Sequence, residues 1–182
     1  MACKINDGLT TSCADKLRVG GLGKTFWIGY LSDLDTQISL AQSADISLLD
    51  FGSYGGLYRF DGNKFSHMFT CEPQKGAGGT VSFKQSFTGK VLSSSTADDV
   101  VLQNLSVGED IFVVVEDNNR TFFILGAGNG MTLEAGTQTS GEAGDSDNRD
   151  SITLVSQEST RPIRFSQATY QQTLDYIVLR EV

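Results

Sequence analysis

The chain has 182 residues, of which 39% are hydrophobic and 20% are charged, and it contains 20 glycines but only 2 prolines. These values are typical of one globular domain with many turns between strands. The formal net charge of −8 opposes binding to polyanions and disfavours sequence-specific recognition of nucleic acid. No apolar run reaches the roughly 18 residues that cross a bilayer, and the first residues lack a signal-peptide core. We therefore expect a protein of the cytoplasm with no membrane partner.

The first 24 residues show no sustained hydrophobic period and end in a glycine-rich stretch. We expect residues 1–24 to form an extended arm. Two cysteines, Cys3 and Cys13, fall in this arm, and the third is Cys71. Their odd number and the absence of metal-ligand spacing indicate reduced thiols.

Strands are predicted directly after the arm. Residues 25–31 are mostly β-branched or aromatic and predict the first strand, whereas the polar residues 32–44 predict a loop. Residues 57–60 and 65–70 predict a hairpin, because the intervening Asp61-Gly62 pair tolerates the positive φ of tight turns.

Three further strands are predicted in the middle of the chain. Residues 80–90 carry apolar side chains at alternate positions and predict a long, half-exposed strand. Residues 110–115 and 120–125 are apolar on both faces, so we expect them at the centre of a sheet, joined by a tight turn at residues 116–119. The residues expected to build the core are Phe26, Trp27, Val81, Phe83, Phe87, Phe112, Val114, Phe122 and Ile124.

One helix is predicted, between residues 96 and 105. Asp98 and Asp99 lie near the positive end of its dipole, where carboxylates are favoured. Gly108 is placed to end it. The apolar residues expected on its buried face are Val101, Leu102 and Leu105.

The last third of the chain begins with a glycine-rich stretch, residues 126–144. Within and beyond it, residues 137–150 are increasingly acidic, and we expect a long, mobile, acidic loop there. Residues 152–155 predict a strand. The tail, residues 169–182, has apolar positions that suit either a strand or a short helix.

Two motifs invite a ligand-binding interpretation. A phosphate-binding loop at Gly23-Lys24-Thr25 would need a glycine where Arg18 stands, and Thr25 opens a strand instead of a helix. A calcium loop at residues 145–156 has acids at its first and third positions, but Arg149, Asp150 and Ser156 occupy positions that need other residues. We expect a glycine hinge in the first case. In the second we expect a solvated acidic loop, with a weak cation site as the alternative.

Catalytic constellations are also missing from the sequence. His67 is the sole histidine and lies in an apparent strand without a nucleophile elbow, so a structural role is expected. The adjacent Asp98 and Asp99 point to different sides of a helix and suit capping better than glycoside hydrolysis. Asn104 and Asn119 match glycosylation signals, which carry no weight without secretion. We therefore predict no catalytic, cofactor-binding or metal-binding residues, no enzyme activity, and a function in association.

Short motifs in a fixed order run along most of the chain. They begin with Met1-Ala2-Cys3, continue through Gly20-Gly21 and Lys24 before an aromatic strand, and reach a glycine-rich stretch that ends at Gly141. The other matching positions are Ile5, Gly8, Cys13, Asp15, residues 114–119, Leu125-Gly126, residues 129–133, Asp147-Asn148, residues 152–154 and Pro162.

On these motifs the chain resembles tail-tube-like structural proteins of tailed bacteriophages, in particular a group from phages of gut Bacteroides that includes crAss-like phages. The match covers roughly residues 1 to 165. Arg120 stands where that group often has glycine, and residues 170–182 extend beyond its usual end.

The resemblance implies a mainly β protein, an antiparallel sandwich or rolled barrel with one short packed helix. The domain would cover residues 25–165, between the arm of residues 1–24 and a C-terminal extension of residues 166–182. Arm and acidic loop would contact neighbouring subunits.

Copies of the protein would assemble in the host bacterial cytoplasm into a homo-oligomeric ring, a hexamer or dodecamer. The ring would belong to the tail of the virion, as part of a tail tube or a neck channel. Its partners would be neighbouring tail or neck proteins and, without sequence specificity, passing DNA. A carbohydrate- or receptor-binding β-sandwich of a virion is the alternative.

Overall fold

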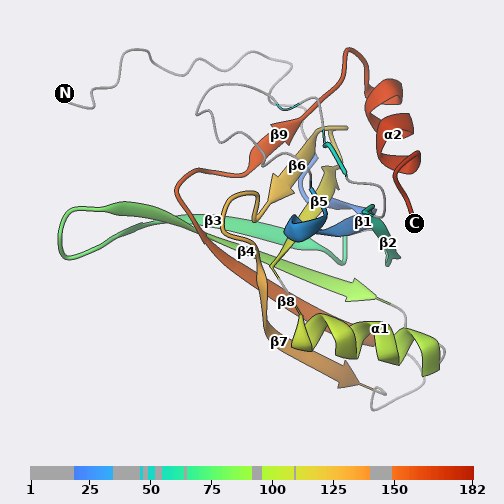
Figure 1. The fold of residues 1–182 in the computed structure, drawn as a ribbon, viewed down its shortest axis with the longest axis horizontal. Helices are drawn as coiled ribbons and strands as arrows, with labels where there is room; N and C mark the ends of the chain where they lie inside the picture. Colours follow the sequence, from blue (N-terminus) through green and yellow to red (C-terminus); the bar gives the residue numbers. More distant parts are fainter. Residues whose placement is uncertain are drawn as a thin grey trace.

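The computed structural model describes residues 19–34, 46, 49–51, 55–63, 65–91, 96–108, 110–139 and 149–182. Within them the protein is mainly β, with two antiparallel sheets, two helices and 53% strand (Figure 1). The N-terminal residues 1–18 and residues 140–148, most of the expected acidic loop, lie outside the described residues.

The first sheet has five strands in the order β2-β1-β5-β6-β9. Their bounds are β1 Leu22–Tyr30, β2 Tyr58–Asp61, β5 Ile111–Asp117, β6 Phe122–Leu125 and β9 Ile163–Phe165. The predicted central strands are confirmed, because β5 is the middle strand and its residues 111–115 are all buried. The predicted turn after it is also confirmed: Asp117 Oδ1 accepts hydrogen bonds from the backbone N–H groups of Asn119 and Thr121, both at 2.8 Å.

The second sheet has four strands in the order β3-β4-β8-β7. Their bounds are β3 Met68–Lys75, β4 Val81–Val91, β7 Thr132–Thr139 and β8 Arg149–Glu158. Side chains alternate along β4: Phe87 and Val91 face inward, whereas Lys84 and Thr88 face outward and are half-buried. This alternation is the pattern of a sheet with one face in a core.

Two cores lie on the two faces of the five-stranded sheet. One is between the sheets, where Phe26 and Val113 meet Phe87 and Leu154. The other covers the opposite face, where Trp27 and Phe122 are packed with Ile177 of the second helix. The five-stranded sheet is therefore the middle layer, which explains why β5 is apolar on both faces.

The two helices occupy different layers. Helix α1 (Thr96–Val107) contributes Leu102 and Leu105 to the core between the sheets, and helix α2 (Tyr170–Val178) belongs to the second core. Thr169 caps α2 by accepting a hydrogen bond from the N–H of Gln172. The prediction of a single packed helix is therefore wrong, because the described residues form two α-helices. The tail, whose sequence suits either a strand or a short helix, contains a helix.

The predicted hairpin of residues 57–60 and 65–70 is wrong. Strand β2 pairs with β1, with Phe60 opposite Phe26, whereas β3 pairs with β4 in the other sheet. Gly62 donates its N–H to the carbonyl of Lys24 at 2.8 Å, and the chain then crosses between sheets. The Asp61-Gly62 pair therefore lies where the chain passes from one sheet to the other. The hairpin is formed instead by β3 and β4.

Three further expectations need correction. Of the loop expected at residues 137–150, residues 137–139 belong to strand β7 and residues 149–150 to strand β8, and the two ends pair with each other, with Thr139 opposite Arg149. Val81 is 50% exposed because it begins β4 at the turn of the β3–β4 hairpin, where both strands are exposed. Val101 is 46% exposed because successive residues turn by about 100° around a helix, and Leu102 and Leu105 take the inner face.

The N-terminal strand also starts earlier than expected. Strand β1 begins at Leu22, which is buried, so Gly23 and Lys24 of the expected arm are strand residues. Before it, the carbonyl of Gly20 accepts a hydrogen bond from Asn118 Nδ2 at 2.9 Å, and the N–H of Val19 donates to Asn119 Oδ1 at 3.0 Å. The β5–β6 turn thus anchors the segment that precedes β1.

Candidate assembly surfaces

The outer strands of the five-stranded sheet are covered by other parts of the chain. Beside β9, Ile46 donates to the carbonyl of Arg164 and accepts from Ser166, both at 2.9 Å. Beside the start of β2, Leu57 donates to the carbonyl of Arg180 at 2.7 Å and accepts from Val182 at 3.1 Å. Backbone groups at these edges are therefore partly paired within the molecule.

The outer strands of the four-stranded sheet have no such cover in the described part of the chain. Among the described residues, strand β3 pairs only with β4, and β7 pairs only with β8. Each therefore presents a row of N–H and C=O groups on its outer side, which is a template for pairing with another chain. Pro73 in β3 is consistent with an edge strand, where a missing N–H is tolerated.

The β3–β4 hairpin projects from the body of the molecule (Figure 1). Its turn is closed by Gly76, which donates to the carbonyl of Thr80 at 2.8 Å and accepts from Gly79 at 3.0 Å. Residues 72–81 are all exposed. Most of these residues are polar or glycine, and Val81 is the large apolar side chain exposed among them.

The outward face of the four-stranded sheet is polar. Gln157 of β8 reaches both strands of the β3–β4 hairpin, because it accepts from Ser82 Oγ at 3.0 Å and donates to Gln74 Oε1 at 2.8 Å. Lys84 of β4 lies 3.7 Å from the carboxylate of Glu134 on β7. This face therefore carries amides, hydroxyls and opposed charges and is not a strongly acidic surface.

The inward face of the same sheet ends in a buried polar network. Gln85 accepts a hydrogen bond from the N–H of Gly126 at 3.1 Å and donates to the carbonyl of Thr160 at 3.0 Å. Glu158, which is 2% exposed, accepts from Ser156 Oγ at 2.6 Å and from the N–H of Asn129 at 3.0 Å. The network ties the segment between β6 and β7 to the second sheet and has a positioning role.

His67 has the structural role that the sequence predicted. It is 3% exposed, its Nδ1 accepts from the N–H of Lys90 at 3.2 Å, and its Nε2 lies 3.1 Å from the carbonyl of Lys24. These partners assign the neutral tautomer that carries its proton on Nε2. Because Lys24 is in β1 and Lys90 in β4, the imidazole joins the two sheets, and Phe26 packs edge-on against it.

The other residues considered as ligand-binding or catalytic are dispersed. Gly23, Lys24 and Thr25 lie inside β1, which excludes the geometry of a phosphate-binding loop. Asp99 is exposed in the first turn of α1, and Cys71 is half-buried on β3. In the described ranges no three histidine, cysteine, aspartate or glutamate side chains gather as metal ligands. None of the helices there is long and apolar enough to span a membrane.

Two titratable side chains, Asp61 of β2 and Tyr170 of α2, have shifted pKa values. Burial acts to raise the pKa of Asp61, but hydrogen bonds from Thr25 and Arg59 outweigh it and hold that pKa below its ordinary value. Burial and the carboxylate of Glu116, which accepts from the Tyr170 hydroxyl at 2.8 Å, raise the pKa of Tyr170. The second contact fastens α2 to β5.

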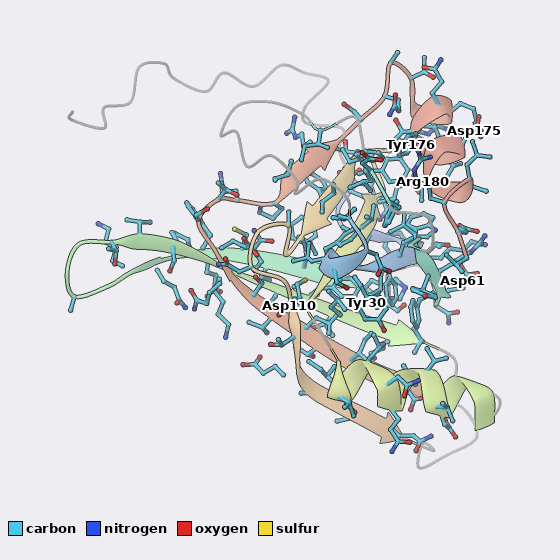
Figure 2. The ribbon with its side chains drawn as sticks, viewed as in Figure 1. Tyr30, Asp61, Asp110, Asp175, Tyr176 and Arg180 are labelled. Carbon is cyan, nitrogen blue, oxygen red and sulfur yellow. The ribbon has the colours of Figure 1, made fainter. Side chains whose placement is uncertain are left out.

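The C-terminal helix is fixed by a further cluster. Arg180 stacks on the ring of Tyr176 at 3.6 Å, and the Tyr176 hydroxyl donates to the carbonyl of Leu49 at 2.8 Å (Figure 2). Trp27 Nε1 donates to Glu181 Oε1 at 2.7 Å. Residues 166–182 therefore help to close the second core.

The fold defines a class, namely mainly β proteins with two stacked antiparallel sheets. Comparisons with models of protein families, with curated proteins and with solved structures find no match to this chain. Sequence reasoning missed the two edges of the second sheet, β3 and β7, that lack a further partner strand among the described residues. The available signal was Pro73, which marks a strand as an edge strand within an alternating run.

Proposed function

We propose that this protein is a structural protein of a phage virion whose copies assemble into a ring around a channel for DNA, in a tail tube or a neck. The observation that carries the proposal is the contrast between the sheets. The five-stranded sheet has its edges partly covered by residues 46 and 180–182, whereas β3 and β7 have no such cover in the described chain. The order of the sequence motifs, on which the chain resembles phage tail-tube-like proteins, supports the same proposal.

The strand directions suit pairing of unlike edges. Adjacent strands in the order β3-β4-β8-β7 are all antiparallel, so β3 and β7 run in opposite directions. When β7 of one copy lies beside β3 of the next, the sheet continues antiparallel across the boundary. Such a contact joins two different surfaces, and it closes into a ring when the rotation per copy divides a full turn.

The outward face of the four-stranded sheet is the face we assign to the channel. Its amides, hydroxyls and paired Lys84 and Glu134 offer no cluster of free cations to hold DNA phosphates. The projecting β3–β4 hairpin would lie against a neighbouring copy and there bury Val81, which is 50% exposed. Residues 1–18 and 140–148 would make further contacts between copies or rings.

Disulfide cross-linking tests the β3–β7 contact. Cys71 lies on β3, and Cys3 and Cys13 can be replaced by serine so that Cys71 is the only thiol. Single cysteines are then introduced on β7 at Glu134, Gly136 or Gln138, all exposed. Oxidation is expected to yield a ladder of covalent oligomers for at least one position, ending at the ring size, and electron microscopy is expected to show rings.

The matched control places the cysteine on β2, as Arg59→Cys, which is exposed in the other sheet. It should not cross-link into a ladder. A protein that stays monomeric at high concentration and forms no ladder from any β7 position would exclude self-assembly through these edges. Deletion of residues 1–18, which stops before β1, is expected to leave a folded monomer that no longer forms rings by sedimentation.

A further inference from the structure

A cavity of about 500 Å³ lies between helix α1 and the strands β7 and β8. Its volume falls within the range of pockets that hold small ligands. The described residues that line it are Asp99, Leu102 and Ser106 of α1, Leu133, Gly136, Thr137 and Gln138 of β7, and Asp150, Ser151 and Ile152 of β8. None of the roles discussed above uses this cavity.

Asp150 is the unusual member of the lining. It is 6% exposed, and its Oδ2 is buried without a hydrogen-bond partner. In the sheet it lies between Val91 of β4 and Gln138 of β7, and it shares the face of β8 with Ile152, two residues on. Burial of a carboxylate oxygen is unfavourable unless a hydrogen bond or an opposite charge compensates it. The wall of the cavity therefore includes a carboxylate, one oxygen of which is buried with no donor from the described chain.

The rest of the lining indicates which donor fits. Asp99 adds a second carboxylate, and no lysine, arginine or histidine is among the described lining residues. A cation is thus favoured over an anion. A metal ion is disfavoured, because the described residues contain no group of three metal-ligating side chains.

The apolar residues of the cavity narrow the choice further. Leu102, Leu133 and Ile152 offer hydrocarbon surface beside the two carboxylates. A ligand with a cationic head and an aliphatic stem satisfies both parts, as lysine and arginine side chains do at protein surfaces. A guanidinium group can also give a carboxylate two parallel hydrogen bonds.

We propose that this cavity binds a guanidinium or ammonium group on an aliphatic stem, with the head at the carboxylate of Asp150 and the stem against Leu102, Leu133 and Ile152. The ligand is either a free alkylamine or alkylguanidine, or a lysine or arginine side chain of a second copy of the chain. This proposal does not depend on ring assembly.

The probe is agmatine, which carries a guanidinium group and an ammonium group at the two ends of an aliphatic stem, titrated into the full chain by calorimetry and by thermal unfolding. Saturable binding and a rise in Tm are expected. Asp150→Asn is expected to weaken binding at least about tenfold, since it removes the charge of the acceptor. The control Glu134→Gln changes an exposed carboxylate on β7 outside the described lining, and binding should be unchanged.

Sedimentation with and without agmatine separates the two sources of the cation. Dissociation of oligomers by agmatine, absent in Asp150→Asn, would identify the side chain of a second copy, whereas unchanged sedimentation with saturable binding would identify a free ligand. Equal binding by the wild type and Asp150→Asn, or no binding by the wild type, would overturn the proposal. If Asp150→Asn does not fold, the NMR chemical shifts of the Ile152 methyl groups in the wild type test the proposal. If these shifts do not change when agmatine is added, the proposal is overturned.

Discussion

The imidazole Nδ1 of His67 accepts a hydrogen bond from the backbone N–H of Lys90 at 3.2 Å, deep between the two sheets. On its other side Nε2 meets the carbonyl of Lys24. One neutral ring therefore satisfies a donor of β4 and an acceptor of β1, and the sheets share a polar fastening within an otherwise aromatic region.

His67→Phe should lower the free energy of unfolding by roughly 1–3 kcal/mol. An aromatic ring is kept, although a slightly larger one, but the N–H of Lys90 and the carbonyl of Lys24 lose their hydrogen bonds to the imidazole. Urea unfolding measures the loss. Met68→Ala, at an exposed position next in sequence, is the control and should change stability by less than about 0.5 kcal/mol. Equal losses in the two variants would contradict the role of the imidazole.

Gly62→Ala should destabilise the fold by about 1–3 kcal/mol, as expected for overpacking. A Cβ at residue 62 would collide with the carbonyl of Lys90 and the ring of His67. Gly78→Ala is the matched control, because nothing lies within 4 Å of the added atom in the β3–β4 turn. Thermal unfolding should place only the first variant clearly below the wild type. If Gly62→Ala is as stable as the wild type, the backbone at residue 62 can shift away from Lys90 and His67 at no cost in stability, and the predicted collision does not matter.

Ile177→Ala should cost about 2–5 kcal/mol, because the side chain is fully buried in the second core. The neighbouring Val178 is 47% exposed, and Val178→Ala should stay within about 0.5 kcal/mol of the wild type. Chemical unfolding of both variants is the measurement. A small loss for Ile177→Ala would mean that α2 contributes little to the second core.

Asp61→Asn should have a pH-dependent effect. The pKa of Asp61 is lower in the folded protein than its ordinary value of 3.8, because the hydrogen bonds from Thr25 and Arg59 outweigh the effect of burial. The ionised carboxylate therefore stabilises the fold above about pH 4, and this contribution is lost as the pH falls through the lowered pKa. The side chain is about half exposed, so solvent screening limits the effect at neutral pH to about 0.2–1 kcal/mol.

Urea unfolding at neutral pH and below about pH 3 checks this prediction, and the difference between Asp61→Asn and the wild type should shrink at the acidic pH. Asp175→Asn is a suitable control, since Asp175 is also exposed and accepts a hydrogen bond from Gln171 instead of a cation. A difference for Asp61→Asn that stays constant with pH would show that the charge has no part in it.

Local sequence patterns predicted those elements whose burial or turn geometry depends on residues close together in the sequence. Strand β4 alternates because one face lies in a core, and β5 is apolar throughout because the five-stranded sheet is buried on both sides. The turn after β5 follows from Asp117, whose carboxylate binds two backbone N–H groups of the same turn. Arg120 there has a φ of 63°, a left-handed conformation that explains why glycine would suit the position.

Pairing between distant segments was not predictable from such patterns. The run of residues 57–70 has the residues of a hairpin, but β2 is held by β1 and β3 by β4, through contacts that are far apart in sequence. Strand β7 has few apolar side chains, because its residues 134–138 are exposed to solvent, and in the described part of the chain it pairs with β8 alone. Its sequence therefore reads as a loop.

The amino-acid sequence by itself determined a mainly β protein with a buried central strand and a structural histidine, because these properties depend on the polarity and shape of neighbouring residues. Only the tertiary structure decided which sheet each strand joins, that α2 closes a second core, that β3 and β7 have no partner beyond β4 and β8 in the described chain, and that Asp150 lines a cavity. These features depend on contacts between segments that are distant in sequence, and local periodicity carries no information about such contacts.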